Sequence, residues 1–146
     1  MKTVADLLKA KPNQTIHVIT PMASVFDAVT LMAKENIGAL LVMEGAQVAG
    51  IVTERDYARK VALMARSSKE ALVREIMTSA VMYVRPDQTS DECMALMTET
   101  RIRHLPVMAG GRLVGLISIG DLVKGVIADQ QFTIQQLEHY IAGDLG

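Results

Sequence analysis

The spacing of apolar residues changes in a fixed order along the early part of the chain. A short run rich in β-branched residues, Thr15–Ile19, predicts a strand. Pro21 interrupts the pattern, and Ser24 followed three residues later by Asp27 is typical of a capped helix start. The apolar positions that follow recur at helical spacing and define one face, made of Val25, Ala28, Val29 and Met32.

Two more strands and another helix are predicted next. The apolar runs Ile37–Met43 and Val48–Val52 flank Gly45, which is typical of a turn between paired strands. A further helix is expected to open near Asp56. The complete unit is therefore β-α-β-β-α, a small α/β sandwich of the α+β type.

The same unit occurs twice. Shifting the sequence by 65 residues aligns Ile16–Asp56 with Val81–Asp121 without a gap, and ten of the 41 pairs are identical. In the second copy, strands are predicted at Ala80–Val84, Leu105–Met108 and Leu113–Ile117, with a turn at Gly110–Gly111. A helix is predicted to begin at Thr89 as N-cap, with Glu92 as the partner of the cap. The apolar face of this helix consists of Cys93, Met94, Leu96 and Met97. Two copies suggest a pseudo-twofold pair in which each half covers the apolar face of the other.

The remaining segments set the expected domain boundaries. We expect repeat 1 at residues 1–66, repeat 2 at residues 67–128 and a C-terminal helical extension at residues 129–146. Tyr57–Ser79 is predicted to be helical with a break at Ser67–Ser68, and Val73–Met77 resembles Val4–Leu8 at an offset of 69. After Gly125 an apolar stripe without a counterpart in the first copy either covers an edge of the core, the usual role of such a stripe, or contacts a partner or a second copy. Its members are Ile127, Ile134, Leu137 and Ile141.

Composition narrows the function classes. The 146 residues are half hydrophobic, which suffices for a core, and 15 basic against 16 acidic residues leave a net charge of −1. The near-neutral charge and the absence of Trp disfavour a nucleic-acid partner. The apolar run Ile37–Met43 is too short to cross a bilayer, and nothing near Met1 resembles a secretory signal. We expect a soluble, cytoplasmic protein without a membrane partner.

A motif at the end of the third strand carries the candidate chemistry. Gly50–Asp56 and Gly115–Asp121 both read Gly, two apolar residues, a hydroxyl residue, two free positions and Asp. A carboxylate beside a hydroxyl at a strand-to-helix junction suits a sugar diol, and amides at a helix start suit anionic oxygens. The alternative is structural, with the hydroxyl residue as N-cap and the Asp at N3. The four residues are Thr53, Asp56, Ser118 and Asp121.

The other reactive side chains favour structural roles. His17 lies in an apolar strand, and Cys93, the single cysteine, lies on an apolar helix face. With three histidines and one cysteine, no cluster has metal-ligand spacing, so we expect no metal site. No base or nucleophile pairs with the carboxylates of Glu54–Asp56, so we expect no catalytic residue and no enzymatic activity.

These motifs resemble the CBS domain (cystathionine-β-synthase domain), in the tandem arrangement called a Bateman module and in its free-standing bacterial form. The resemblance rests on Ile37–Val42 with Gly50–Asp56 and on Ile102–Val107 with Gly115–Asp121, and it covers roughly Val4–Ala128. It implies two pseudo-twofold-related repeats that bind an adenine nucleotide, AMP, ADP, ATP or NAD, with S-adenosylmethionine ranked behind them. It also implies a homodimer.

The resemblance further implies a role for individual residues. Asp56 and Asp121 would hold ribose hydroxyls, with Thr53 and Ser118 beside them, in clefts built crosswise from both repeats. The wall of the Asp56 cleft would be Ile51, Thr78, Met82, Tyr83, Ile102 and Arg103. The wall of the Asp121 cleft would be Leu116, Thr15, His17, Ile37 and Gly38.

The two copies differ at the expected phosphate contacts. Arg103 and His104 of the second repeat correspond to Gly38 and Ala39 of the first. Because an arginine offers a charge-assisted fork to phosphate, we expect the cleft served by Arg103 and His104 to bind the phosphorylated ligand more tightly. The alternative is that Arg103 is a solvated surface charge and His104 a tolerated strand residue.

The expected function is a regulatory sensor that passes its nucleotide state to another protein. A ligand can act in this way only through unequal affinity for two arrangements of the protein. The first alternative is a structural or adaptor protein with vestigial clefts, and the second is an enzyme acting on nucleotides.

Overall fold

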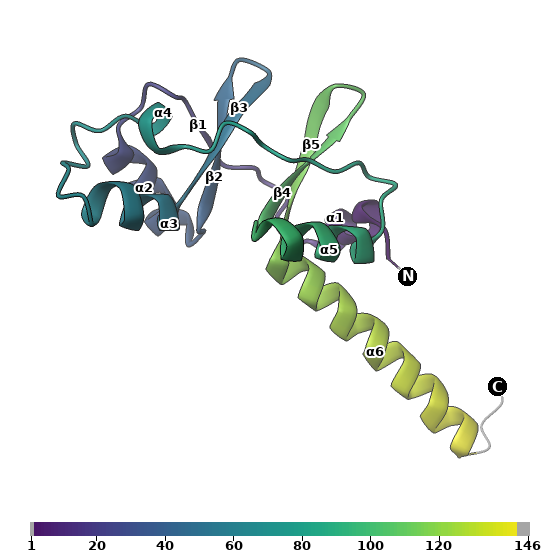
Figure 1. The fold of residues 1–146 in the computed structure, drawn as a ribbon. Coiled ribbons are helices and arrows are strands. Elements are labelled where there is room, and N and C mark those ends of the chain that lie inside the picture. Colours follow the sequence, from purple (N-terminus) through teal and green to yellow (C-terminus); the bar gives the residue numbers. More distant parts are fainter. Residues whose placement is uncertain (1, 143–146) are drawn as a thin grey trace. The chain divides into compact units, whose positions relative to one another are not determined.

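The computed structural model describes residues 2–142, and its fold is mixed α/β (Figure 1). Its contacts divide the chain into two compact units. The Asp56 unit comprises residues 15–83 and 109–114. The Asp121 unit comprises, among the described residues, 2–14, 84–108 and 115–142. The boundaries expected at 66/67 and 128/129 divide the sequence into repeats, and they stay predictions.

The Asp56 unit contains a three-stranded sheet. Its elements are β1 (Val18–Ile19), α2 (Val25–Glu35), β2 (Ala39–Glu44), β3 (Gln47–Thr53), α3 (Glu54–Tyr57), the π-helical turn η1 (Ala58–Ala62) and α4 (Val73–Ile76). The strand order is β1-β2-β3, with β1 parallel to β2 and β2 antiparallel to β3. The predicted β-α-β-β-α order of the first repeat is confirmed.

The Asp121 unit repeats the pattern with a shorter sheet. Its elements are α1 (Val4–Ala10), α5 (Ser90–Thr100), β4 (His104–Ala109), β5 (Arg112–Ser118) and α6 (Ile119–Ile141), except for the hairpin residues 109–114, which belong to the Asp56 unit. β4 and β5 form a two-stranded sheet, and the turn between them uses positive φ angles at Gly110 and Gly111 (57° and 78°). Glycine adopts this backbone region without the steric cost that other residues bear.

The long helices of the two repeats begin and end in the same way. Ser24 Oγ accepts from the amide of Asp27 at 3.1 Å, and Thr89 Oγ1 accepts from that of Glu92 at 3.2 Å. The predicted N-caps are thus confirmed, but α2 and α5 lack the reciprocal bond that would complete a capping box. Both helices end on a residue in the left-handed region, Asn36 and Arg101, which are equivalent at the offset of 65.

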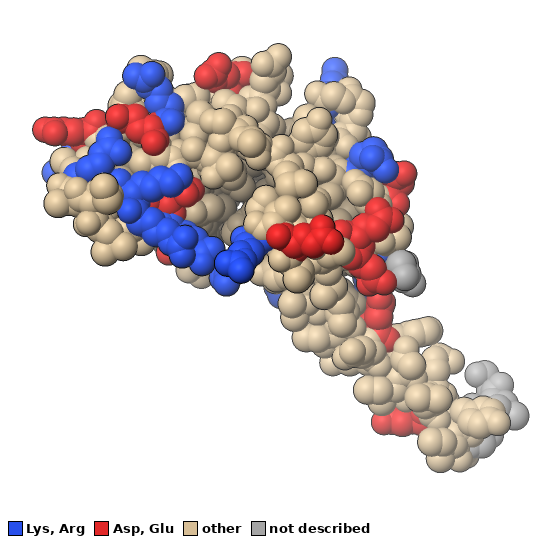
Figure 2. Space-filling view, viewed as in Figure 1, with Lys and Arg blue, Asp and Glu red and all other residues tan. Residues whose placement is uncertain are grey.

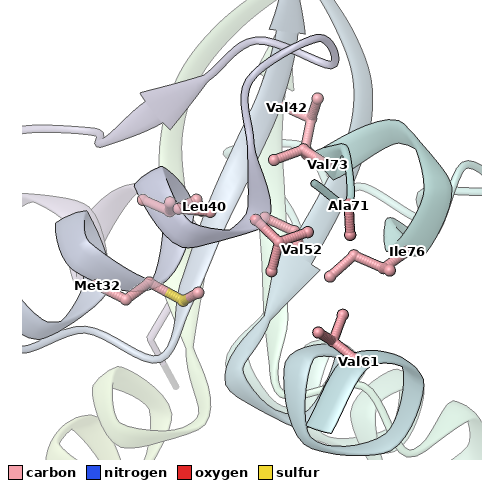
Figure 3. Packing of buried hydrophobic residues seen from close by; sticks show 10 residues of the cluster. Met32, Leu40, Val42, Val52, Val61, Ala71, Val73 and Ile76 are labelled. Carbon is pink, nitrogen blue, oxygen red and sulfur yellow. The ribbon is translucent and has the colours of Figure 1, made fainter. Parts of the chain in front are cut away.

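Each unit has its own apolar core, and the segment before each repeat helps to build one. Val73 and Ile76 of α4 are fully buried in the core of the Asp56 unit (Figure 3). Val4 and Leu7 of α1 are buried in the core of the Asp121 unit. The resemblance between these two segments at an offset of 69 therefore reflects equivalent packing.

The first strand of each repeat is shorter than predicted. Only Val18–Ile19 of the expected Thr15–Ile19 pairs with β2, and of Ala80–Val84 only Val84 forms a bridge, parallel to Val107. The amide of Val84 donates to Pro106 O at 3.0 Å. The ladder stops there because Pro106 has no N–H to donate to the preceding part of the segment.

Two helical predictions require correction. Within Tyr57–Ser79 the helix ends at Ala62, and only Val73–Ile76 is helical after it. The break is therefore much longer than the expected Ser67–Ser68. The C-terminal stripe does not cover the core, because every residue from 127 to 142 is exposed. The part of the extension at residues 143–146 lies outside the described residues.

No helix within residues 2–142 combines the length and the apolar character that a membrane span requires.

Candidate functional site

Asp56 lies at the junction of β3 and α3, where it closes a capping box with Thr53. Its Oδ2 accepts from the amide and from the hydroxyl of Thr53, both at 3.0 Å. Thr53 Oγ1 in turn accepts from the amide of Asp56 at 3.1 Å. The structural alternative, with Thr53 as N-cap and Asp56 at N3, is therefore confirmed, and it occupies one carboxylate oxygen.

The other oxygen of Asp56 faces a lysine. Lys60 Nζ lies 3.3 Å from Asp56 Oδ1 and also donates to Ile76 O at 2.8 Å. The Asp56 side chain is only 15% exposed, whereas that of Lys60 is 46% exposed. Arg55 and Arg59 are exposed on the same short helical segment, and Figure 2 shows Lys and Arg side chains gathered over the region of α3. The carboxylate thus lies in a positively charged surrounding.

Asp121 repeats the arrangement at the junction of β5 and α6. Its Oδ2 accepts from the amide of Ser118 at 2.9 Å and from the hydroxyl at 3.0 Å, and Ser118 Oγ accepts from the amide of Asp121 at 3.2 Å. Lys11 Nζ lies 3.1 Å from the same Oδ2 and donates to Leu116 O at 2.8 Å. The Asp121 side chain is 14% exposed. Both aspartates are therefore mostly buried carboxylates, each beside a hydroxyl and an ammonium group.

The start of the second strand lies beside each helix start. The amide of Glu54 donates to Gly38 O at 3.0 Å, and the amide of Ile119 donates to Arg103 O at 2.9 Å. The two bonds are equivalent in the two repeats. The first places the backbone of Gly38 next to the Asp56 capping box. The backbone of Arg103 likewise lies next to the Asp121 capping box.

His104 shares the environment of Asp121. Burial lowers the pKa of His104 below its ordinary value, the carboxylate of Asp121 opposes this shift, and the positive charges of Lys11 and Arg103 reinforce it. The imidazole of the folded protein is therefore the neutral form at neutral pH. Arg103 is exposed.

The structure brings part of the predicted Asp56 wall together. Ile51 and Thr78 exchange two backbone hydrogen bonds, at 3.0 and 2.9 Å, beside the end of β3. Met82 and Tyr83 belong to the same unit and have exposed side chains. Ile102 packs against the core of the Asp121 unit, as a partly buried residue.

The predicted wall of the Asp121 cleft is distributed over both units. Leu116 belongs to the Asp121 unit, and its carbonyl binds Lys11. The other four residues belong to the Asp56 unit; they are Thr15, His17, Ile37 and Gly38. His17 Nε2 lies 3.7 Å from Glu35 Oε2, which fits the structural role expected for it. The grouping of these residues around Asp121 stays a prediction.

Cys93, the single cysteine, lies in the core of the Asp121 unit. Cys93 is buried, as predicted, and burial raises the pKa of its thiol, with the charge of Glu92 acting in the same direction. Across residues 2–142 no group of three or more His, Cys, Asp or Glu side chains could hold a metal ion.

The sequence reasoning missed the two lysines. Lys60 follows Asp56 by four residues, a helical spacing that brings the two side chains together, so that pair could have been read from the sequence. Lys11 precedes Asp121 by more than a hundred positions, and only the packing of the N-terminal segment against β5 brings it there.

The fold and this pair of sites define a tandem repeat of a small α/β domain. The family model of the CBS domain matches residues 3–63 and 73–128, and the chain belongs to the CBS-domain family. A CBS-domain protein from Burkholderia ambifaria MC40-6 is similar at 66% identity with a TM-score of 0.86, over 91% of this chain and 99% of the other.

Two more relatives extend the comparison. The mitochondrial CBS domain-containing protein CBSX3 of Arabidopsis thaliana is 38% identical over 97% of this chain and 72% of its own length. The structure of CBSX2 in complex with AMP matches with a TM-score of 0.73 at 26% identity, over 89% of this chain and 99% of that one. The resemblance to tandem CBS domains is thus confirmed.

Proposed function

We propose that this chain is a regulatory module that binds an adenine nucleotide through Asp56 and Asp121 and transmits its ligand state to another protein. The observation that carries the proposal is the recurrence of one arrangement at both junctions: a sheltered carboxylate in a capping box with a lysine ammonium beside it. The complex of the relative CBSX2 with AMP supports an adenine nucleotide as the ligand class.

The ribose would bind at the carboxylates. Two vicinal hydroxyl groups donate well to one ionised carboxylate, and the hydroxyl oxygens of Thr53 and Ser118, which donate their own hydrogens to the aspartates, can accept a further hydrogen bond. The capping bonds hold each carboxylate in place before the ligand arrives, which reduces the ordering that binding requires. The capping role and the ligand role are therefore compatible, since the first positions the group that the second uses.

The phosphates would bind at the guanidinium of Arg103 and at the neutral imidazole of His104, which donates one N–H. Arg103 and His104 are proposed phosphate contacts, and the ammonium groups of Lys11 and Lys60 neutralise carboxylates that would otherwise repel an anionic ligand. Because Gly38 and Ala39 replace Arg103 and His104 in the first repeat, we propose unequal affinities for the two sites. The crosswise assignment of wall residues stays part of this proposal.

The proposal includes a homodimer in the cytoplasm that regulates another protein without catalysing a reaction itself. Among the possible ligands AMP, ADP, ATP and NAD come before S-adenosylmethionine. Signal transmission requires that the ligand bind one arrangement of the protein more tightly than another, and the affinity difference sets the strength of the signal.

Calorimetric titration of the full chain with each nucleotide tests the proposal. Asp121→Asn and Asp56→Asn keep the size of the side chain but remove its charge, so each is expected to weaken binding at its own site by about 10- to 100-fold. Asp6→Asn is the matched control, because Asp6 forms the same capping box with Thr3 at 3.0, 3.0 and 3.2 Å outside the proposed sites.

Nucleotide binding that both aspartate variants leave unchanged would contradict the proposal. A thermal melt that none of the nucleotides shifts, at millimolar concentration, would favour an adaptor protein with vestigial clefts. Turnover of a nucleotide under the same conditions would favour an enzyme.

A further inference from the structure

The exposed face of α6 carries a heptad pattern. Ile127, Ile134 and Ile141 are seven residues apart, and Val123, Gln130 and Leu137 form a second series at the same interval. The two series alternate at spacings of three and four residues, as the a and d positions of a coiled coil do. These six residues are called the α6 seam below. Five of them are apolar, and their side chains lie one above another on a single helix face.

Nothing in the described part of the chain covers the α6 seam. Its apolar members are between 45 and 83% exposed, although each is a large aliphatic residue. α6 buries only Leu122 and Gly125, which face α1 and α5 and lie about 130° around the helix from the seam. A helix with two apolar faces, one of them already buried, has a second face available for a partner.

The length and the charge of the seam suit a second helix of the same kind. Val123 to Ile141 spans about 27 Å at 1.5 Å per residue. Between residues 126 and 141 the only Asp, Glu, Lys or Arg residues are Asp129 and Glu138. The far part of α6 accordingly presents mostly uncharged side chains on the face seen in Figure 2. Two such helices can approach each other without burying unpaired charges.

The charges that flank the seam select an orientation. Lys124 and Glu138 both occupy the e position of the heptad, fourteen residues apart. In an antiparallel pair that sets Val123 opposite Ile141 and Ile127 opposite Leu137, e positions face e positions, so Lys124 lies opposite Glu138 of the second copy, twice. In a parallel pair e positions face g positions, where Lys124 would meet Ile119 and Glu138 would meet Thr133.

We propose that the α6 seam is a self-association surface, on which α6 of a second copy of this chain packs antiparallel. The occupant is a second copy because α6 offers apolar layers to a copy of itself, and the two Lys124–Glu138 pairs form only in the antiparallel orientation. Gln130 then faces Ile134 of the second copy, and this polar position at the centre fixes the register at some cost in affinity. The inference rests on the homodimer of the proposed function, for which it names the surface, and it is independent of the proposed nucleotide sites.

Analytical ultracentrifugation of the full chain over a range of micromolar concentrations tests the surface. Ile134→Asp puts an unpaired charge in the centre of the seam and is expected to weaken the dimer by about 100-fold or more. Phe132→Asp is the matched control, because Phe132 is also an exposed apolar residue of α6 but lies outside the seam. Gln130→Leu is expected to tighten the dimer. Since position 134 is exposed, circular dichroism should show that the variant keeps its fold.

Charge exchange and crosslinking test the orientation. Lys124→Glu is expected to weaken the dimer by about 3- to 10-fold, and adding Glu138→Lys should restore it. A mixture of the single variants Gln130→Cys and Ile134→Cys should form a disulfide between the two, whereas neither variant alone should crosslink, because like positions meet only in a parallel pair.

Three results would overturn the proposal. A monomeric wild-type chain at about 100 μM would exclude it, as would a dimer that Ile134→Asp and Phe132→Asp leave equally intact. Efficient crosslinking of Gln130→Cys or of Ile134→Cys with itself through the introduced cysteine would exclude the antiparallel orientation. Nucleotide titration of Ile134→Asp separates this outcome from the proposed function, since unchanged binding there leaves the ligand sites standing.

Discussion

Lys11 Nζ lies 3.1 Å from Asp121 Oδ2, on the same oxygen that closes the capping box at the start of α6. Lys11 is the C-cap of α1, so the N-terminal segment supplies the cation that pairs with a carboxylate of the second repeat. The same ammonium group donates to Leu116 O at 2.8 Å. One side chain thus joins the N-terminal segment, the end of β5 and the first turn of α6.

Lys11→Met is expected to destabilise the protein by about 1–2 kcal/mol, because the partly buried Asp121 loses its cation. Lys60→Met is the matched comparison and should cost less than about 1 kcal/mol, since the Lys60 side chain is twice as exposed as that of Lys11 (46% against 23%) and water screens its ion pair. Urea denaturation measures both values. Equal losses of stability in the two variants would contradict the view that the more buried ion pair contributes more to stability.

The same variants report on the ligand. Lys11→Met is expected to weaken ATP binding more than adenosine binding. The lost ammonium group attracts the negatively charged phosphates of ATP, and adenosine has no phosphate. Calorimetric titration with the two ligands gives the ratio of affinities. An equal loss for adenosine and ATP would mean that the lysine only positions Asp121.

Gly50→Ala and Gly115→Ala are expected to destabilise the protein to different extents, although the two glycines are equivalent. A Cβ at position 50 would lie 2.7 Å from Thr78 O, a backbone atom fixed by its pairing with Ile51, whereas at position 115 it would lie 2.6 Å from the Cδ2 of the Leu8 side chain. A side chain yields more easily than a backbone ladder. Chemical denaturation should give about 3 kcal/mol for Gly50→Ala and about 1–2 kcal/mol for Gly115→Ala. The reverse order would contradict this reasoning.

Arg101→Gly is expected to stabilise the protein by about 0.5–1 kcal/mol. Arg101 ends α5 with φ 58°, a conformation that costs energy for a residue with a Cβ and none for glycine. Asn36→Gly is the matched control at the equivalent end of α2, where φ is 55°, and it should gain less because asparagine tolerates this region better. Thermal unfolding of both variants checks the order, and a lower melting temperature for Arg101→Gly would contradict it.

The parts of the fold that the sequence predicts are those whose causes are local. Ser24 and Thr89 cap their helices with side chains three residues from the amides they bind, and glycines mark the hairpin turns. The Lys11–Asp121 pair and the short first strands could not be predicted in the same way. The first depends on tertiary packing of the N-terminal segment, and the second on Pro106 of the neighbouring strand, which lacks the donor that a longer ladder needs.

The C-terminal extension shows why an apolar stripe alone leaves two interpretations open. Ile127 and Ile134 have the spacing of a buried face, and the usual interpretation is that they cover the core. In the structure they are exposed, because the core contacts of α6 come from Leu122 and Gly125 on another face. Only the placement of the neighbouring helices decides which face is buried.

His104 makes the stability of the fold depend on pH in a predictable direction. Because burial lowers the pKa of His104 in the folded state, the unfolded chain binds more protons than the folded one below the ordinary histidine value of about 6.5. The contribution of His104 to the free energy of unfolding therefore has its largest value above about pH 6.5. It decreases as the pH falls through that value toward the lower pKa of the folded state.

His104→Gln should remove this contribution and flatten the pH dependence between about pH 7 and pH 5, as measured by urea denaturation at a series of pH values. His17 and His139 remain in the variant, so the difference from the wild type isolates His104. A bound phosphate beside the imidazole would favour its protonated form, and AMP is then expected to bind the wild type more tightly at pH 6 than at pH 7.5 while the variant shows a smaller change. Identical pH profiles for the two proteins, with and without AMP, would show that His104 neither titrates in this range nor faces the ligand.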